Sequence, residues 1–198
     1  MKFKTFKNTT ILFSIFLLSS CLKDTYSPPE GNTIPEGAEV IEYDNFPGLV
    51  HVILRNGEMI SAEGDFFNGL ESGAYTEYND KGVVTSIINY YKGAQQGLTF
   101  VFKSNELQSK ANYHDGVLHG DYKQYNRRKL IEEKTYENGK LQGVARKFYT
   151  NGNIMEEAFY NVGQLDGIAR WFNQEGEMTI AYKYDKGELI DENPELKE

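Results

Sequence analysis

Two histidines with nearby carboxylates are the residues of this chain whose types could bind a metal. His114 and His119 flank one short connection, and Asp115 and Asp121 stand beside them in the sequence. Histidine and aspartate together form a donor set that zinc accepts. Equivalent positions in other copies of this connection, described below, carry Glu, Asn, Gln or Asp instead. We therefore interpret both histidines as polar loop residues, and we predict neither a metal site nor a cofactor.

Paired acidic residues could perform general acid–base catalysis. Glu132-Glu133 and Glu156-Glu157 supply such pairs, but they recur at equivalent, solvent-facing positions, whereas a catalytic pair is normally unique. The sequence also contains no G-x-S-x-G, P-loop, G-x-G-x-x-G or H-E-x-x-H motif. We therefore predict that the protein is not an enzyme, and that the third histidine, His51, is a packed or solvated strand residue.

Aromatic residues are the strongest candidates for binding. Exposed tyrosine and tryptophan are typical of protein-contact surfaces. The predicted binding surface consists of Tyr75, Tyr122, Tyr149 and Trp171, which lie near one another along the first strand of each repeat described below. The alternative is that these side chains form a second hydrophobic face of a sheet.

The glycines predict the elements that carry these residues. Two glycine columns, four residues apart, recur every 23 or 24 residues: Gly69, Gly93, Gly116, Gly139, Gly163 and Gly187, followed by Gly73, Gly97, Gly120, Gly143 and Gly167. A Tyr or Phe stands three residues before each first glycine, and another stands five residues after each second glycine. Repetition at a fixed period indicates a repeat architecture. Each unit of about 23–24 residues therefore reads as one β-hairpin.

The turn residues predict how the strands connect. Asn-Gly is a strong signal for a two-residue hairpin turn, and it occurs at Asn56-Gly57 and at Asn151-Gly152, with strands expected over residues 143–150 and 154–160. The Gly-x3-Gly segments would form the reverse connections, where glycine permits tight backbone geometry. We therefore predict an all-β fold, an antiparallel β-hairpin repeat array with stacked aromatic residues on one face.

This pattern resembles the MORN-repeat variant family of bacterial proteins. The copy at residues 138–160 shows the motif as Asn138-Gly139, Gly143, Phe148-Tyr149, Gly152 and Tyr160. The resemblance covers residues 43–190, although the first copy is weak and the second and third lack the hairpin glycine. It implies the hairpin-array fold. It also implies an antitoxin role, since many members carry that label, while other MORN proteins are scaffolds or membrane-associated modules.

The amino terminus predicts export. Residues 1–20 combine three lysines, no acid and the apolar run ILFSIFLL, which is typical of a signal peptide; a buried amphipathic helix is the alternative. Leu18, Ser19, Ser20 and Cys21 resemble the lipobox of bacterial lipoproteins. That resemblance implies cleavage before Cys21 and acylation of this residue, for example with palmitate. Leu22 rather than Asp after the cysteine implies the outer membrane.

Composition shifts divide the rest of the chain. Residues 21–40 would hold the lipidated cysteine and a flexible tether with three of the five prolines, an extended arm packed on the domain being the alternative. Residues 41–190 would form the repeat domain, and residues 191–198 a polar tail that ends the array.

Charge limits the partners. The formal net charge of −8 becomes −11 once residues 1–20 and their three lysines are removed, and an acidic chain is unsuited to nucleic acid. We expect a lipid-anchored cell-envelope module that binds a protein and requires no cofactor, with an immunity-like role in which the acidic domain neutralises a basic toxin. The alternatives are a glycan- or peptidoglycan-binding lipoprotein, against which the single Trp argues, and a structural envelope component.

Overall fold

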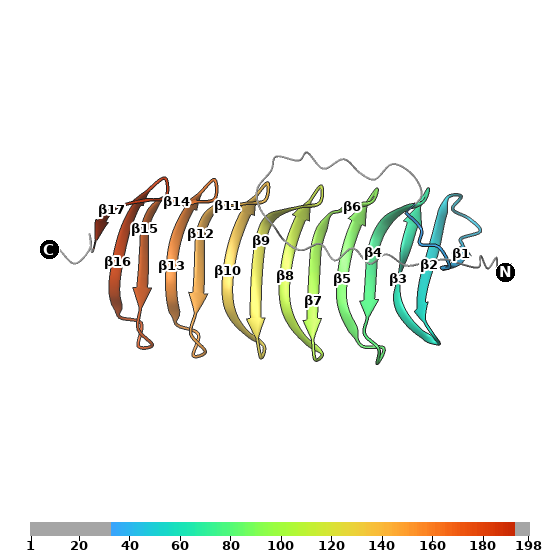
Figure 1. Cartoon of the computed structure of the whole chain (residues 1–198), viewed down its shortest axis with the longest axis horizontal. Coiled ribbons are helices and arrows are strands. Elements are labelled where there is room, and N and C mark those ends of the chain that lie inside the picture. The colour runs from blue at the N-terminus through green and yellow to red at the C-terminus, as the bar shows by residue number, and fades with distance from the viewer. Residues whose placement is uncertain (1–32, 193–198) are drawn as a thin grey trace. The chain divides into compact units, whose positions relative to one another are not determined.

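A computed structural model describes residues 33–192, and these residues form an array of antiparallel β-hairpins, as the sequence predicts. The predicted signal peptide, lipobox and Cys21 lie outside the described residues, as do residues 193–198. No helix in the described part of the chain is long and apolar enough to cross a membrane. The chain divides into two compact units, one ending at Gln96 and the other beginning at Gly97, and each is described by itself. Figure 1 labels strands of both units.

The first unit is built around a small apolar core. Its strands are β1 (Glu39–Glu42), β2 (Leu49–Asn56), β3 (Met59–Phe67), β4 (Leu70–Tyr78), β5 (Val84–Tyr91) and β6 (Ala94–Gln95). Val52 from β2 and Phe66 from β3 are fully buried, with 0% and 1% of their surface exposed, and Ala38 packs against them. These are the largest fully buried side chains among the described residues.

Part of the predicted tether belongs to this core. Ile34 packs against the buried residues, and the Thr33 amide and hydroxyl both donate to the carbonyl oxygen of Gly69, at 2.7 and 3.0 Å. β1 then pairs with β2 from Glu39 to Glu42. The structured domain therefore begins before the predicted boundary at residue 41, and the packed-arm alternative describes residues 33–40.

The second unit has a core of small residues. Its strands are β7 (Gly97–Lys103), β8 (Glu106–His114), β9 (Val117–Asn126), β10 (Lys129–Glu137), β11 (Lys140–Leu141), β12 (Gly143–Phe148), β13 (Ile154–Asn161), β14 (Gln164–Leu165), β15 (Gly167–Phe172), β16 (Met178–Asp185) and β17 (Glu188–Glu192). Its buried residues in the described structure are Thr99, Ala111, Ala158, Ala169 and Ala181. Asp191 and Glu192, expected in the polar tail, are the last residues of β17.

The two glycine columns have different conformational roles. The first glycine is the second residue of a two-residue turn with positive φ at both positions, as at Asn138 (48°) and Gly139 (77°), which is the type I′ geometry that suits hairpins. The second glycine lies in a bulge. Tyr136 pairs with Leu141 and Glu133 with Arg146, so β12 carries two extra residues, and Gly143 has a φ of 79° there.

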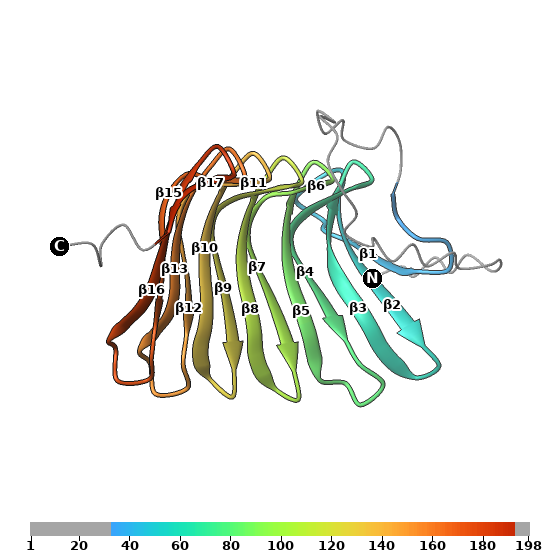
Figure 2. The ribbon, with the colours of Figure 1, turned by 60° about the vertical axis from the view of Figure 1, so that its left-hand side comes forward.

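The opposite ends of the hairpins correct two predicted turns. At Asn56-Gly57 the turn residues are Gly57 and Glu58, because Asn56 pairs with Met59. At Asn151-Gly152 the strands end at Phe148 and resume at Ile154, which leaves a wider five-residue loop instead of a two-residue turn. The Tyr149 amide donates to the Asn153 carbonyl at 2.8 Å and closes that loop. Figure 2 shows the tight turns along the upper edge of the second unit and the wider loops below.

Candidate functional site

Two of the four predicted aromatic residues lie on one face of the second unit. Tyr122 on β9 packs edge-to-face on Tyr136, with ring centroids 6.2 Å apart. Trp171 on β15 packs in the same way on Tyr182 at 5.5 Å. The strand register places both pairs on the same side of the sheet, which we call the tyrosine face. Their side chains are half-buried, because each ring is covered partly by its neighbour and partly by solvent.

The other two predicted aromatic residues have different surroundings. Tyr75 lies in the first unit, where it packs on Phe66 and Tyr90 and contacts the buried core. Burial there raises the pKa of Tyr75 to about 12. Tyr149 lies in the loop after β12, where its hydroxyl donates to the carbonyl of Phe172 at 2.7 Å. The alternative of a hydrophobic sheet face therefore describes Tyr75, while Tyr149 has a structural contact.

The opposite face of the second unit carries a row of ion pairs, which we call the charge ladder. It runs across β9, β10, β12, β13 and β15 through Lys123, Glu133, Arg146, Glu157 and Arg170. Successive nitrogen–oxygen distances are 3.7, 3.1, 2.7 and 3.5 Å. Hydrogen bonds to Glu157 and then Glu133 raise the pKa of Arg146. The ladder links five strands that have few large buried side chains.

The paired acids of the sequence are thus divided between the two faces. Glu133 and Glu157 belong to the ladder, while Glu132 and Glu156 point to the tyrosine face and bind Lys134 and Lys147 at 2.9 and 2.8 Å. These acids were predicted to be solvent-facing. The structure shows instead that they are partly buried and paired. Glu133, Glu156 and Glu157 bind bases on neighbouring strands, where opposite charges stabilise a sheet, whereas Glu132 binds Lys134 on its own strand.

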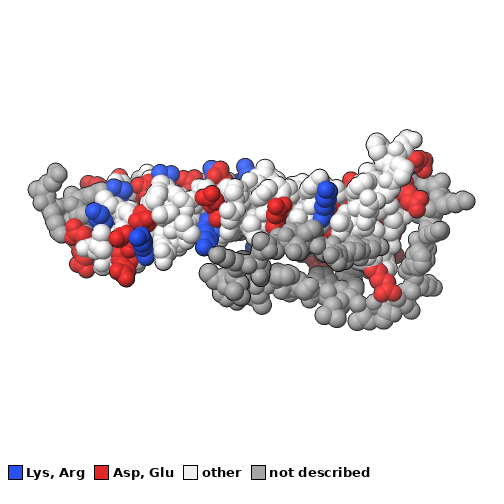
Figure 3. All heavy atoms as spheres, turned by 90° about the horizontal axis from the view of Figure 1, so that it is seen from above, with Lys and Arg blue, Asp and Glu red and all other residues white. Residues whose placement is uncertain are grey.

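Both signs of charge lie close together at the surface. Figure 3 shows basic and acidic side chains interspersed over the C-terminal part of the chain, seen from above.

A polar cluster on the first hairpin was not predicted. The two ring nitrogens of His51 lie 2.8 Å from Asp65 and 3.5 Å from Glu63. The Tyr43 hydroxyl donates to Asp65 at 3.1 Å, and the Tyr78 hydroxyl donates to Glu63. That hydrogen bond, with burial, raises the pKa of Tyr78 to about 12. The His51 ring thus lies within reach of two carboxylates of β3, and the only sequence signal for this cluster was the alternation of Glu63 and Asp65 on that facing strand.

The other two histidines lie together. The rings of His114 and His119 are 5.7 Å apart, and His119 Nδ1 accepts a hydrogen bond from the Asn138 amide at 3.4 Å. Across residues 33–192, no group of three His, Cys, Asp or Glu side chains is arranged to hold a metal ion.

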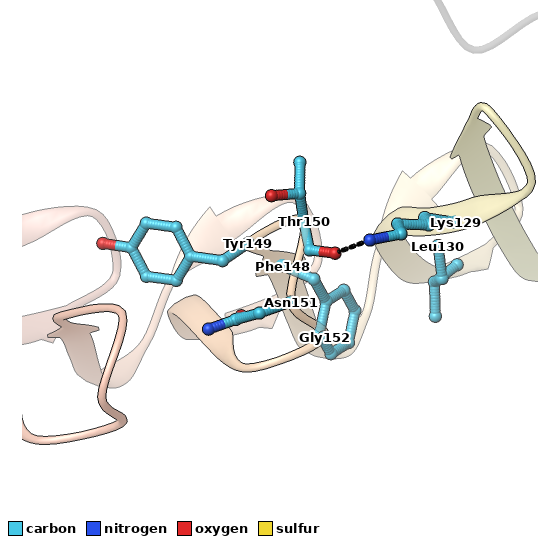
Figure 4. A pocket seen from close by; sticks show the side chains of 7 residues that line it. All are labelled: Lys129, Leu130, Phe148, Tyr149, Thr150, Asn151 and Gly152. Carbon is cyan, nitrogen blue, oxygen red and sulfur yellow. Dashed lines mark hydrogen bonds between the residues drawn. The ribbon is translucent and has the colours of Figure 1, made fainter.

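A shallow cavity of about 300 Å³ lies at the wide-loop edge of the second unit. It is lined by Lys129, Leu130 and the residues from Phe148 to Gly152. Figure 4 shows Leu130 and Phe148 facing the same space, with the Lys129 ammonium bonded to the Thr150 carbonyl above it, whereas Tyr149 and Asn151 point away. We call this cavity the notch.

The notch results from unequal loop lengths. The five-residue loop at 149–153 stacks on the next wide loop, where the side chains of Asn151 and Asn153 both donate to the Gln174 carbonyl, at 2.9 and 2.7 Å. On its other side stands the two-residue turn Arg127-Arg128, which is too short to cover the loop. The notch therefore has an apolar floor and a rim with one ammonium.

Comparisons with known proteins leave the family open. No family model matches the chain, and no curated protein does. Among solved structures, a crystal structure of TarM aligns with 55% of this chain and 21% of its own length, at 14% identity and a TM-score of 0.35. A mutant of S. aureus TarM in complex with fondaparinux, alpha-GlcNAc-glycerol and UDP aligns with 78% of this chain and 21% of its own length, at 13% identity and a TM-score of 0.21. The MORN-repeat resemblance stays a prediction.

Proposed function

We propose that this protein is a non-catalytic, lipid-anchored module of the cell envelope that binds a protein through the tyrosine face. The observation that carries the proposal is the pair of half-exposed aromatic contacts, Tyr122 with Tyr136 and Trp171 with Tyr182, on one face of the second unit. Rings that are fixed by neighbours lose little entropy on binding, which makes them effective contact residues.

The negative net charge of the chain supports a basic protein as the partner. The formal charge of −11 after cleavage would attract a basic protein over long distances. This is the basis for the immunity-like version of the proposal, in which the bound protein is a toxin that acts outside the cytoplasm. Antitoxin-type members of the family that the sequence resembles are consistent with this version.

The anchor rests on the sequence. A lipobox at Leu18–Cys21 supports acylation of Cys21, and Leu22 supports the outer membrane as the destination. Several acyl chains anchor a protein stably, whereas one chain anchors it only reversibly. The expected outcome of Cys21→Ala is release or mislocalisation of the protein, measured by membrane fractionation. Unchanged fractionation would refute lipidation.

In-cell cross-linking tests the binding proposal. The full chain with a carboxyl-terminal affinity tag is cross-linked in intact cells and purified in detergent, and the captured material is analysed by mass spectrometry. We expect one stoichiometric protein, lost in Trp171→Ala and kept in Phe159→Ala. Phe159 is the matched control because it is an aromatic residue with 42% exposure in the same unit, on the opposite face. Capture of nothing, or equal loss in both variants, contradicts the proposal.

The notch favours a second candidate, a glycan-binding lipoprotein. Its apolar floor of Leu130 and Phe148 beneath a polar rim is the kind of surface on which a sugar ring could pack. Recovery of glycan with the tagged wild-type chain and its loss in Phe148→Ala, with no protein captured, would select this candidate over protein binding.

A further inference from the structure

The charge ladder is incomplete at one end. Beyond Lys123, the next residue in the same row is Lys110 on β8, which lies directly opposite Lys123 in the strand register. Like charges directly opposite one another in a sheet are destabilising. From Lys123 to Arg170 the ladder alternates in sign at every step, so this is the step at which the alternation fails.

Lys110 has no compensating acid. Among the described residues no carboxylate lies within ion-pair distance of its ammonium, although Lys123 is bonded to Glu133 at 3.7 Å. On the other side of β8 the residue facing Lys110 is Phe100. Asp121, two residues before Lys123 on β9, is exposed and pairs with Thr135 of β10 in the strand register. Lys110, a residue of intermediate exposure, therefore stands at the position where the alternation of charges calls for an acid.

We propose that the Lys110–Lys123 pair is a binding site for a carboxylate on an acidic segment of a protein partner. A carboxylate above these two strands, which are about 4.8 Å apart, would contact both ammonium groups. It would replace a repulsive contact with two attractive ones. This surface lies on the face opposite the tyrosine face, so the inference does not rest on the proposed function.

The neighbouring residues select a protein segment over a continuous polyanion. One strand beyond Lys123 the ladder presents Glu133, and two strands further it presents Glu157. A chain of phosphates that followed the row would be repelled at both positions. A peptide with one or two acids among apolar side chains avoids that repulsion, and it finds apolar partners on β7 in Phe100 and in Leu98, which is 38% exposed.

Charge reversal at Lys110 separates binding from stability. The full chain carrying Cys21→Ala is compared with the same chain carrying Lys110→Glu or, as a matched control, Lys103→Glu. Lys103 is exposed at the end of β7 and lies outside the ladder, so both substitutions change the net charge equally. Lys110→Glu completes the alternation beside Lys123, and we expect it to raise the melting temperature by about 2 °C.

Binding is measured by NMR titration with a short peptide that carries two glutamates among leucine and threonine residues. We expect shifts at the Lys110 and Lys123 amides, a Kd at least about tenfold weaker in Lys110→Glu, and a change within about twofold in Lys103→Glu. The same peptide with glutamine in place of each glutamate should leave both amides unshifted. The proposal is overturned by equal weakening in the two variants, by no shift at millimolar peptide, or by inorganic polyphosphate binding the pair as tightly as the peptide does.

The cross-linking experiment distinguishes this inference from the proposed function. A protein captured by wild type and by Lys110→Glu alike, but lost in Trp171→Ala, supports the tyrosine face and places that partner outside the Lys110 site. If the acidic peptide also fails to bind, the present inference fails while the proposed function stands. If nothing is captured and the peptide binds as described, the proposed function fails while the Lys110–Lys123 site stands.

Discussion

The two units of the chain use one repeat but are stabilised by different chemistry. In the first unit, Val52 and Phe66 are fully buried and gather Ala38 and Ile34 around them. In the second unit the buried residues that the structure describes are four alanines and one threonine. There, ion pairs lie on both faces of the sheet: the charge ladder crosses the strands on one face, and on the other Lys147 binds Glu156 across strands while Lys134 binds Glu132 on its own strand.

This difference shows what the repeat requires. The constant features are backbone features: a type I′ turn at the first glycine and, in the copies that carry the second glycine, a bulge there. In the second unit, each bulge glycine pairs with a tyrosine on the following long strand, as Gly143 pairs with Tyr160. Side chains elsewhere in the hairpin can be apolar or charged, provided that cross-strand neighbours match.

The largest expected effect is the removal of the first unit's core. Phe66→Ala should destabilise that unit by about 3–5 kcal/mol, because a fully buried phenylalanine leaves a cavity. Hydrogen exchange should show faster exchange of the β2, β3 and β4 amides and little change from β12 to β16. The control Phe159→Ala, on the second unit, removes a ring that is 42% exposed and should cost less than about 1 kcal/mol. Equal costs would show that the two units do not differ as described.

The periodic features of this molecule could be predicted from the sequence. Glycine and aromatic spacing predicted the hairpin array, the repeat length and the position of the reverse connections, because those depend on local backbone geometry. The prediction of a two-residue turn at Asn151-Gly152 was wrong, since Phe148 pairs with Ile154 and the loop contains five residues. A dipeptide signal specifies that a turn occurs, but the register of the strands decides its length.

Features that depend on which strands face one another were not predicted. The charge ladder, the His51 cluster and the notch each need the register, because a shift of one residue would move Glu133 to the other face. The division of the aromatic set depends instead on the packing partners of each ring, which the repeat pattern does not specify. Tyr75 and Tyr122 occupy equivalent repeat positions, yet Tyr75 contacts a buried core and Tyr122 lies on the half-exposed tyrosine face.

A second prediction contrasts two glycines. A methyl group on Gly64, in the first unit, would lie 2.6 Å from Tyr75 Cδ2 and 3.1 Å from the Ala74 carbonyl oxygen. Gly64→Ala should therefore cost about 2–3 kcal/mol by overpacking. Gly143, in the second unit, has open space around it but a φ of 79°, so Gly143→Ala should cost about 1 kcal/mol through backbone strain. Urea denaturation measures both.

A double variant identifies the cause of each cost. Tyr75→Ala combined with Gly64→Ala should cost less than the sum of the two single variants, since the clash is with that ring. The same Tyr75→Ala should add to Gly143→Ala without coupling. Additive behaviour in both pairs would contradict the packing role of Gly64.

Alkaline pH should weaken both units, the first through buried Tyr75 and the second through a lysine ion pair together with Tyr113, Tyr122 and Tyr136, whose pKa values burial also raises. Burial raises the pKa of Tyr75 from 10 to about 12, so the folded state holds this proton more tightly than the unfolded chain does. The stability that this proton contributes to the folded state is fully present below pH 10 and is lost as the pH rises through about 12. In the second unit, the hydrogen bond to Glu156 raises the pKa of Lys147, and that contribution is likewise lost on the alkaline side.

Salt and substitution separate these two alkaline effects. The denaturation midpoint is followed from about pH 9 to pH 12. Tyr75→Phe should flatten the decline of the first unit at any salt concentration, because the ring is buried. Molar salt should reduce the pH dependence of the second unit, because the Lys147–Glu156 pair is partly exposed and screened. If neither Tyr75→Phe nor molar salt alters the fall of the denaturation midpoint with pH, groups other than Tyr75 and Lys147 cause that fall.

The smallest effect concerns turns without glycine. The type I′ turns of the first unit have glycine second, as in Asn68-Gly69, whereas Arg128 of the second unit has a φ of 64°. Arg128→Gly should stabilise the protein by about 0.5–1 kcal/mol by removing that strain. The ion pair it deletes, with Glu106 at 3.3 Å, has an arginine side chain that is 84% exposed and contributes little.

Gly139→Ala is the matched reverse change in the same unit. No atom lies within 4 Å of the added methyl group, so the variant tests backbone conformation alone, and it should lower the melting temperature by about 2–4 °C. If Gly139→Ala destabilises as expected while Arg128→Gly has no effect, the Glu106 pair offsets the strain. The charged contacts of the second unit would then stabilise even its turns, which would sharpen its contrast with the apolar first unit.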